Sequence, residues 1–329
     1  MLSRVANSMY WMCRYLERAE NVARFLSVNL HLLLDIKCYN QMQQWEPMIQ
    51  VTGDHEEFEK KHSDYSRENV IRFLTFDKDY ANSIVSCLWF ARENARSIRE
   101  IISSEMWEQI NRFYLDINDA EKFSLPFDHP HKFFDTIKIK GHLFSGLLYS
   151  TMTHNEAWHF SRMGLLVERA DKISRILDVK YYFLLPQIDY VGTPFDSIQW
   201  AATLKSASAL EMYRKRFHRI SSKNVSNFLI FEDRFPRSIR YCVRNVKESM
   251  HRITGSSVNS NLSPAEKNIG RLKADLDYTD ISEVINMGMH EFIDDFQKKL
   301  NKVDDAINCS FFKIKAPKNG MQFQSQSGE

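Results

Sequence analysis

An eight-residue charged motif occurs twice in this chain and constrains the fold more than any other feature. The first copy is Glu17-Arg18-Ala19-Glu20-Asn21-Val22-Ala23-Arg24, and the second is Glu168-Arg169-Ala170-Asp171-Lys172-Ile173-Ser174-Arg175. A looser third copy runs from Arg92 to Glu100. Because no pattern recurs every ~20–50 residues, the motif indicates one duplicated helical unit rather than a solenoid of short repeats.

The first copy lies in a segment with the periodicity of a long packed helix. At about 100° per residue, nine apolar side chains form one stripe: Val5, Met9, Met12, Leu16, Ala19, Ala23, Leu26, Leu30 and Leu33. Such a stripe is typical of a bundle helix that packs along its whole length. The polar residues Tyr10, Arg14, Glu17, Asn21 and Arg24 lie together about a quarter-turn away, and Glu20 lies close to the stripe.

Charges beside a core stripe need partners, because an unpaired buried charge is costly. The second copy offers such partners at the same helical phase, in Glu168, Asp171 and Arg175. We therefore expect half-buried ion pairs between the two copies. Two interpretations remain open: salt bridges that fix the register of the helices, or a polar ligand or docking site on facing helices. The candidate ligand- or partner-binding residues are Arg14, Glu17, Arg18, Glu20, Asn21, Arg24, Arg92, Glu93, Asn94, Arg96, Glu168, Arg169, Asp171, Arg175 and Arg237.

Glycine and proline are scarce, and no segment alternates like a strand between turn dipeptides. The sequence therefore predicts an all-α fold, a large helical bundle with two quasi-repeated halves. We expect a single domain over residues 1–312, with halves at about 1–123 and 132–312, and a disordered tail at 313–329.

Helix ends are expected where capping residues, glycine and proline occur. The expected helices are a first helix from Ser3 to the late thirties, a helix over Asp79–Ile102, one helix from Gly192 to about Phe217, a helix with Pro236 in its first turn that ends at Gly255, and a last helix with Ile281 to Val303 on its apolar face. Between them we expect a loop over Ser124–His131, a Ser/Asn-rich linker over 256–263 and a capping box at Ser263–Glu266.

Bulk properties exclude several classes of protein. The net charge of +2 gives no basis for binding nucleic acid, and no run of ~18 apolar residues predicts a membrane span. The segment Met1-Leu2-Ser3-Arg4 leads directly into an amphipathic helix, unlike a secretory signal. Five cysteines without a Cys-x-x-Cys pair argue against a disulfide framework and a zinc ribbon. We therefore expect a cytoplasmic protein.

Metal and nucleotide chemistry have weak sequence support. Glu156-x-x-His159 and Glu248-x-x-His251 match the pair that ferritin-like di-metal bundles take from two helices, with Glu17 and Glu93 as the lone carboxylates from two others. A chain of this composition contains about one such pair by chance. Neither a Gly-x-x-x-x-Gly-Lys-[Ser/Thr] loop nor a Gly-x-Gly-x-x-Gly loop occurs. We expect no cofactor and no metal.

Several ordered motifs resemble one family. Its opening is matched by Met1 to Ala6, Tyr10-Trp11 and Arg14 to Arg24, and later matches are Ala91 to Arg96, Arg99-Glu100, Glu105 to Glu108, Asn111, Glu168 to Asp171 with Arg175, Phe228-Leu229 and Phe235 to Ser238. Together they are similar to the bacterial alpha-E domain proteins, over residues 1 to about 250. The sequence departs from that family at Arg162 to Val167, where an arginine expected near position 165 is absent. This departure puts a ligand contact there in doubt.

The resemblance implies an all-helical cytoplasmic protein, encoded beside a circularly permuted ATP-grasp protein and a transglutaminase-like cysteine peptidase. That setting implies an accessory role in ATP-dependent formation of amide or peptide bonds. Two alternatives come from other classes: an enzyme that uses the carboxylate cluster for acid–base chemistry or metal binding, and a structural module that forms a homodimer.

Overall fold

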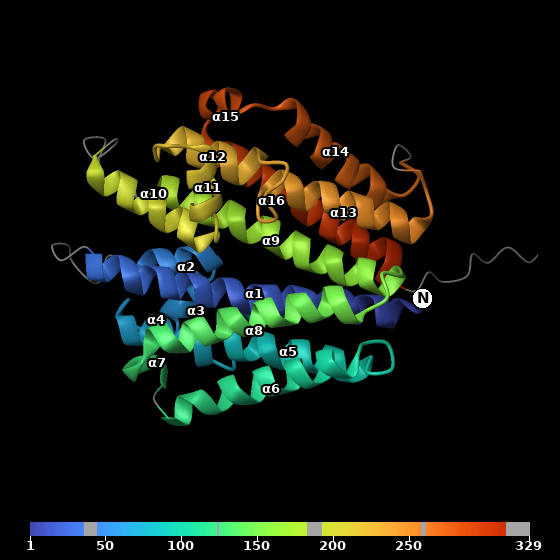
Figure 1. Cartoon of the computed structure of the whole chain (residues 1–329), viewed down its shortest axis with the longest axis horizontal. Coiled ribbons are helices and arrows are strands. Elements are labelled where there is room, and N and C mark those ends of the chain that lie inside the picture. The colour runs from blue at the N-terminus through green and yellow to red at the C-terminus, as the bar shows by residue number, and fades with distance from the viewer. Residues whose placement is uncertain (36–44, 124, 183–192, 258–260, 314–329) are drawn as a thin grey trace, which may run out of the picture.

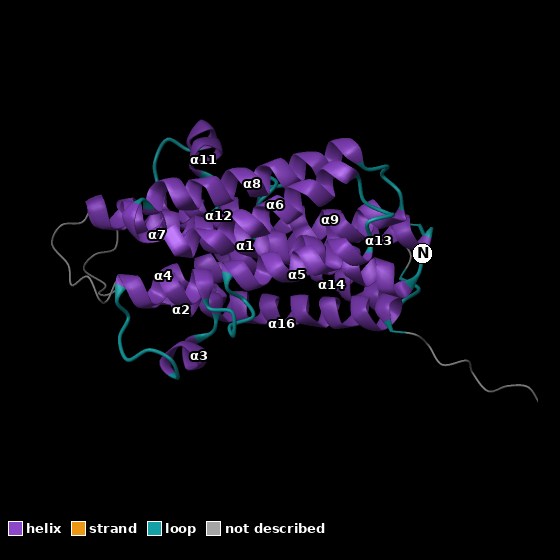
Figure 2. Ribbon diagram, turned by 90° about the horizontal axis from the view of Figure 1, so that it is seen from below, coloured by secondary structure: helices purple, strands orange, loops and turns teal. Residues whose placement is uncertain are grey.

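The fold consists of helices joined by short loops. The computed structural model describes residues 1–35, 45–123, 125–182, 193–257 and 261–313, and these ranges contain no strand (Figure 2). The prediction of an all-α fold is confirmed. The predicted tail beyond Lys313 and the centre of the predicted linker at 256–263 lie outside the described residues.

Eight long helices form two bundles of four. The first bundle contains α1 (Ser3–Asp35), α5 (Ile84–Ser97), α6 (Ser104–Ala120) and α8 (Pro130–Thr151), and the second contains α9 (Glu156–Tyr182), α13 (Ile239–Thr254), α14 (Pro264–Tyr278) and α16 (Met289–Ile307). In each bundle the first helix packs against the second and the fourth, and the third packs against the same two. The leading helices α1 and α9 also pack along each other, which joins the bundles (Figure 1).

The two bundles lie on either side of the α1–α9 pair. In Figure 1, α5 and α6 lie below α1, and α13 and α14 lie above α9. Figure 2 shows α8 and α16 on opposite sides of α1. Shorter elements complete the ends of the bundles: α2 (Glu46–Thr52), α3 (His55–Glu59), α4 (Arg67–Phe76), the 3₁₀ turn η2 (Glu121–Phe123), α7 (Leu125–Asp128), α10 (Pro194–Ser206), α11 (Leu210–Arg216), α12 (Ser222–Phe231), α15 (Ile281–Met287) and the π-helical η4 (Asn308–Phe312).

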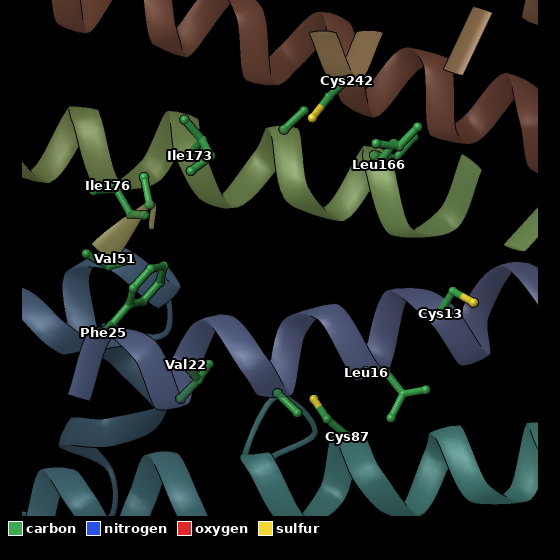
Figure 3. Packing of buried hydrophobic residues seen from close by; sticks show 14 of the residues in the cluster. Cys13, Leu16, Val22, Phe25, Val51, Cys87, Leu166, Ile173, Ile176 and Cys242 are labelled. Atoms are coloured by element: carbon green, nitrogen blue, oxygen red, sulfur yellow. The ribbon is translucent and has the colours of Figure 1, made fainter. Parts of the chain in front are cut away.

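The duplication extends to individual residues of α4–α5 and α12–α13. Ser83 caps α5 by accepting a hydrogen bond from the amide of the third residue beyond it, and Ser238 caps α13 in the same way. One turn later Cys87 and Cys242 are both fully buried. Figure 3 shows Cys87 facing α1 from below and Cys242 facing α9 from above. The caps and the cysteines therefore occupy equivalent places in the two halves.

Apolar side chains of both leading helices are buried in the core. Leu16 and Val22 of α1 and Leu166 and Ile173 of α9 are each at most 3% exposed and belong to one continuous core (Figure 3). Burying a side chain of this size contributes about 1.5–3 kcal/mol relative to its exposure. The stripe predicted along α1 is buried over the positions that the structure describes, from Val5 to Leu30.

The predicted division between the halves differs from the observed one. Helix α8 was expected to begin the second half, yet it packs against α1 and α6 and completes the first bundle. The two bundles are therefore divided between α8 and α9, at residues 152–155. Sequence could not reveal this, because the apolar face of α8 does not show which neighbour covers it.

Several predicted helix ends were also wrong, for local reasons. Helix α5 begins after its cap Ser83 rather than at Asp79, and the segment expected as a loop contains α7 and the start of α8, which Pro130 opens at a position where proline is favoured. The helix expected from Gly192 is split at Ser208, whose φ is 51°. Pro236 precedes α13 instead of lying in its first turn.

Two further helices were not predicted as separate elements. Helix α12 lies just before the predicted start of α13, and the last apolar face is divided into α15 and α16 at Gly288, whose φ of 104° requires glycine. The capping box at Ser263–Glu266 is confirmed.

Candidate functional site

A network of buried charges lies along the contact of α1 and α9. We call it the charged seam, and it consists of Arg14, Glu17, Arg18, Glu20, Asn21 and Arg24 of α1, Glu168, Arg169, Asp171, Lys172 and Arg175 of α9, and Arg237 from the loop before α13. The sequence predicted that the charges of the two motifs would be half-buried. The structure buries the carboxylates more deeply: Glu17 and Glu20 are each 2% exposed, and Glu168 is 0% exposed.

The centre of the charged seam is a reciprocal pair of double hydrogen bonds. Arg18 of α1 donates from Nε and Nη2 to the two oxygens of Glu168, at 2.7 and 2.9 Å. Arg169 of α9 donates from Nε and Nη2 to the two oxygens of Glu17, both at 2.9 Å. Each Glu-Arg pair of one motif therefore binds the Glu-Arg pair of the other. Bidentate guanidinium–carboxylate pairs of this kind are short, strong and geometrically specific.

The Glu168 end is extended by residues of three helices. Arg14 Nε donates to Glu168 at 3.0 Å, and Arg14 Nη1 donates to Asp304 of α16 at 2.6 Å. The hydroxyl of Tyr10 donates to the other oxygen of Asp304 at 2.5 Å. Lys172 lies 3.6 Å from Glu168. In the second motif Leu165 occupies the position equivalent to Arg14, so the arginine that the resemblance leads one to expect has no substitute there.

The Glu17 end is closed by a residue from outside both motifs. Arg237 donates from Nη1 to Glu17 at 2.9 Å and from Nη2 to Glu20 at 2.7 Å. Asn21 donates to Glu17 at 3.0 Å, and Arg24 pairs with Glu20. The equivalent of Arg237 in the first half is Asn82, whose side-chain oxygen accepts from Arg18 at 2.5 Å. The loops before α5 and α13 therefore both contribute to the charged seam, but only one contributes a charge.

These contacts keep the carboxylates ionised. Burial alone would raise the pKa of Glu17, but Arg169 and Arg237 outweigh burial and the pKa lies below its usual range. Burial would likewise raise the pKa of Glu168, but Arg18, Lys172 and Arg14 outweigh burial and hold this pKa well below its usual value. A general acid or base that works near neutral pH needs a pKa close to 7. The charged seam is therefore suited to holding helices in register rather than to proton transfer.

The lowered pKa values predict how stability depends on pH. A carboxylate with a lower pKa in the folded chain than in the unfolded chain stabilises the fold above the unfolded value, which is about 4.3 for Glu. We expect the free energy of unfolding to change little from neutral pH to about pH 5, and to fall progressively below about pH 4.3 as the unfolded chain takes up more protons. Urea unfolding at several pH values across this range measures the free energy of unfolding. A free energy that stays constant down to about pH 3 would contradict the prediction.

The third copy of the motif does not join the charged seam. Arg92 donates to Asn111 at 2.7 Å, Arg96 pairs with Glu93 at 2.6 Å, and Asn94 donates to the carbonyl of Phe90 at 2.8 Å. Helix α5 turns Cys87, Leu88, Ala91 and Ala95 inward, which leaves these charges half-buried or exposed on its other faces. These residues therefore lie outside the charged seam and stay predicted candidates for ligand or partner binding, because charge spacing alone does not show which face of a helix meets a partner.

A family model decides the identity of the chain. It matches residues 1–312 and is described as Alpha-E, a predicted alpha-helical domain with a conserved ER motif. The chain belongs to the Alpha-E family. Its Glu17-Arg18 and Glu168-Arg169 pairs form the reciprocal double hydrogen bonds at the centre of the charged seam. The resemblance read from the sequence is thereby confirmed.

Curated relatives of this Alpha-E chain occur in mycobacteria. Proteins described as uncharacterized from Mycobacterium bovis and Mycobacterium tuberculosis are each 24% identical over 276 residues, which covers 78% of this chain and 30% of the relative. The chain thus spans under a third of the length of the curated relatives it matches. No solved structure matches the chain. Among the described helices of this Alpha-E chain, none combines the length and the apolar character needed to cross a membrane.

The residues considered for a metal site have other partners in the Alpha-E fold. Glu156 pairs with the N-terminal amine at 2.9 Å, and Glu248 lies 3.3 Å from Arg162. Nδ1 of His159 is hydrogen-bonded to the hydroxyl of Ser249, and Nδ1 of His251 is hydrogen-bonded to the hydroxyl of Ser256 at 2.7 Å. Across the described ranges no three His, Cys, Asp or Glu side chains converge as metal ligands. Burial raises the pKa of the Cys13, Cys87 and Cys242 thiols to about 12, which opposes formation of a thiolate nucleophile.

Sequence reasoning missed several contributors to the charged seam. Asn82 could have been found from the sequence. Aligning the Asn-Val and Phe-Leu dipeptides of α4 with those of α12 places Asn82 opposite Arg237. Asp304 of α16 and His142 of α8 carry no such signal, because neither belongs to a repeated motif. Only the packing of α16 and α8 beside α1 brings them near.

A surface groove of about 760 Å³ lies on the outer side of the loop that carries Arg237. The groove is lined by residues of α11, α12, the loop between α12 and α13, and the start of α13: Met212, Arg216, Phe217, Asn227, Phe228, Phe231, Glu232, Asp233, Arg234, Phe235, Pro236 and Arg240. Its wall combines phenylalanine rings with three arginines and two acids. On the inner side of the same loop, Arg169 Nη1 donates to the Pro236 carbonyl at 3.3 Å. The loop therefore connects the charged seam to the groove.

Proposed function

We propose that this Alpha-E chain is a non-catalytic accessory component of an ATP-grasp-type system that forms amide or peptide bonds, and that it binds a partner protein or that protein's substrate at the groove. The observation that supports this proposal most is the position of the loop over residues 232–238. It extends Arg237 into the charged seam and presents Arg234 and Pro236 to the groove.

The charged seam supports this role as a rigid base. Four hydrogen bonds fix the loop to the charged seam: three from Arg237, to Glu17, Glu20 and Asn21, and one from Arg169 to the Pro236 carbonyl. A binding surface that is held in its bound shape loses less conformational entropy on association. In this proposal the Glu/Arg network positions the surface without touching the ligand.

The groove has the size and lining of a recognition site. A volume of about 760 Å³ falls in the range of small-ligand sites. Phe217 is half-buried and offers apolar surface, whereas the rings of Phe228 and Phe231 behind it are buried. The exposed Arg216 and Arg234 offer charge. Arginine and aromatic residues are enriched where proteins bind one another.

The identity of the partner rests on the family resemblance. The alpha-E proteins that this chain resembles accompany a circularly permuted ATP-grasp protein and a transglutaminase-like peptidase. The mycobacterial relatives add a second argument, because the matched region makes up only 30% of each polypeptide. In those proteins the matched region is covalently joined to other sequence, as expected of a part that acts with neighbours.

Calorimetry tests the proposal directly. We expect the purified chain to bind a circularly permuted ATP-grasp protein from the same genome with micromolar affinity or better, and more tightly with Mg-ATP than without it. Arg234→Ala should weaken binding about tenfold, as loss of an interface arginine does. Arg252→Ala, an equal change of charge at an exposed position on the far end of α13, should leave the affinity unchanged.

Two outcomes would count against the proposal. An absence of binding with and without nucleotide would remove the accessory role, and equal weakening by both arginine substitutions would show that the groove is not the interface. Tight self-association of the chain without any ligand would instead favour the structural homodimer.

A further inference from the structure

Arg24 is the one arginine of the charged seam that has a buried guanidinium nitrogen without a hydrogen-bond partner among the described residues. The residue is 4% exposed. Its Nη1 meets the hydroxyl of Ser208 and its Nη2 meets Glu20, but its Nε is buried and donates to nothing in the described ranges. A buried donor without an acceptor is costly and points to an acceptor that the described residues do not supply.

The charges around Arg24 do not balance. Arg24, Arg169 and Arg237 share two carboxylates, those of Glu17 and Glu20. Nη2 of Arg24 and Nη2 of Arg237 both bind the same atom, Oε1 of Glu20. Three cations, two of them buried and one half-buried, therefore meet two anions at this end of the seam.

The equivalent place in the other half shows an arginine whose Nε has its acceptor. Arg175 is the counterpart of Arg24, and its Nε donates to both oxygens of Asp171 at 3.1 and 2.9 Å. Lys172 there adds a third cation beside Glu168 and Asp171, as Arg237 does beside Glu17 and Glu20. The two halves therefore differ in the Nε of Arg24, which is buried without an acceptor among the described residues.

The pKa values follow this contrast. Attraction by Asp171 raises the pKa of Arg175. Burial, together with the neighbouring charge of Arg237, lowers the pKa of Arg24 to about 10 even though Glu20 and Glu17 oppose the change.

The Arg24 site is within reach of solvent. Two exposed residues cover it, Ser208 of the α10–α11 turn and His142 of α8, whose side chain is 60% exposed. The ring Nε2 of His142 lies 3.4 Å from Arg24 Nη2 and 3.4 Å from Glu20 Oε1. Gly141 lets α8 approach this closely, since a Cβ there would lie 2.6 Å from Glu20 Oε2. Lys138, one turn earlier on α8, pairs with Asp135 at 2.6 Å and donates to Ser27 at 3.2 Å.

We propose that the chain binds a small oxyanion, a carboxylate or a phosphate group, at the Arg24 site, with Arg24 Nε as the central donor and His142 and Ser208 at its mouth. An oxyanion there supplies the missing acceptor and balances the third cation. Guanidinium groups favour both kinds of anion, because their planar donors match carboxylate and phosphate oxygens. The site is separate from the groove and does not depend on the ligase partner.

Thermal unfolding in different salts tests this proposal. We expect inorganic phosphate, acetate or both to raise the melting temperature of the wild-type chain above that in chloride of equal ionic strength. Arg24→Met removes the excess charge while keeping most of the volume. We expect this variant to fold and to bind the same anion at least about tenfold more weakly, the usual loss with a charge-assisted hydrogen bond. Arg175→Met, the matched change in the other half, should retain the anion response relative to its own baseline.

The two probes distinguish the sources of the anion. A response to phosphate alone indicates a phosphate group, and a response to acetate alone indicates a carboxylate. No response in the wild type, or an equal response in wild type and Arg24→Met, would overturn the proposal. If Arg24→Met does not fold, His142→Ala and Ser208→Ala at the exposed mouth take its place, and an unchanged response in both would overturn it equally.

Discussion

Replacing Glu168 by Gln should lower the free energy of unfolding by about 3–5 kcal/mol, the usual cost of removing one partner from a buried ion pair. Glu168 is 0% exposed and accepts from Arg14 and Arg18, with Lys172 close by. The amide keeps the shape of the side chain but not its charge. Three cations then remain beside a neutral group in the core. Urea unfolding followed by circular dichroism measures the loss.

Glu93→Gln is the matched control. Glu93 belongs to the looser third copy and pairs with Arg96, whose side chain is 64% exposed. Exposed pairs of this kind contribute about 0–1 kcal/mol, so the control should change stability by no more than that. Equal effects at Glu93 and Glu168 would mean that burial of the seam does not govern its energetics. Unchanged stability of Glu168→Gln together with lost partner binding would instead make Glu168 a ligand-binding residue.

Gly164→Ala should destabilise the chain by about 3 kcal/mol or more, at or above the upper end of the usual cost of overpacking. A Cβ at Gly164 would lie 2.1 Å from the carbonyl oxygen of Tyr10 and 2.9 Å from its carbonyl carbon. Both atoms are backbone of α1, so they cannot swing aside as a flexible side chain would. The two leading helices would have to separate where they pack most closely. Thermal and urea unfolding both report this change.

Gly146→Ala on α8 provides the opposite control. Nothing lies within 4 Å of a Cβ at this exposed helical position. Alanine there should stabilise the chain by about 0.5–1 kcal/mol, because glycine loses more conformational freedom when it enters a helix. If Gly164→Ala were as well tolerated as Gly146→Ala, the close approach of α1 and α9 at Tyr10 would be disproved.

The sequence by itself determined the helical class, the duplication and the residues at the centre of the charged seam. The stripe from Val5 to Leu30 has a helical period, and such a stripe marks a helix that packs along one face. The repetition of Glu-Arg at the same helical phase predicted that Glu17 and Glu168 would find partners in each other's motif. Both properties are local or periodic, so they can be read from a linear chain.

Tertiary structure alone decided which helices cover the pair of motifs. The third copy also carries Glu and Arg at helical spacing, yet α5 turns Arg92 and Arg96 away from the seam. Asp304 and His142 reach the seam from α16 and α8, which no repeat marks. Asn82 and Arg237 occupy equivalent places, and the difference between them matters because Arg237 is a third arginine that shares two carboxylates. Balance of charge in a core depends on distances between side chains remote in sequence, and packing fixes those distances.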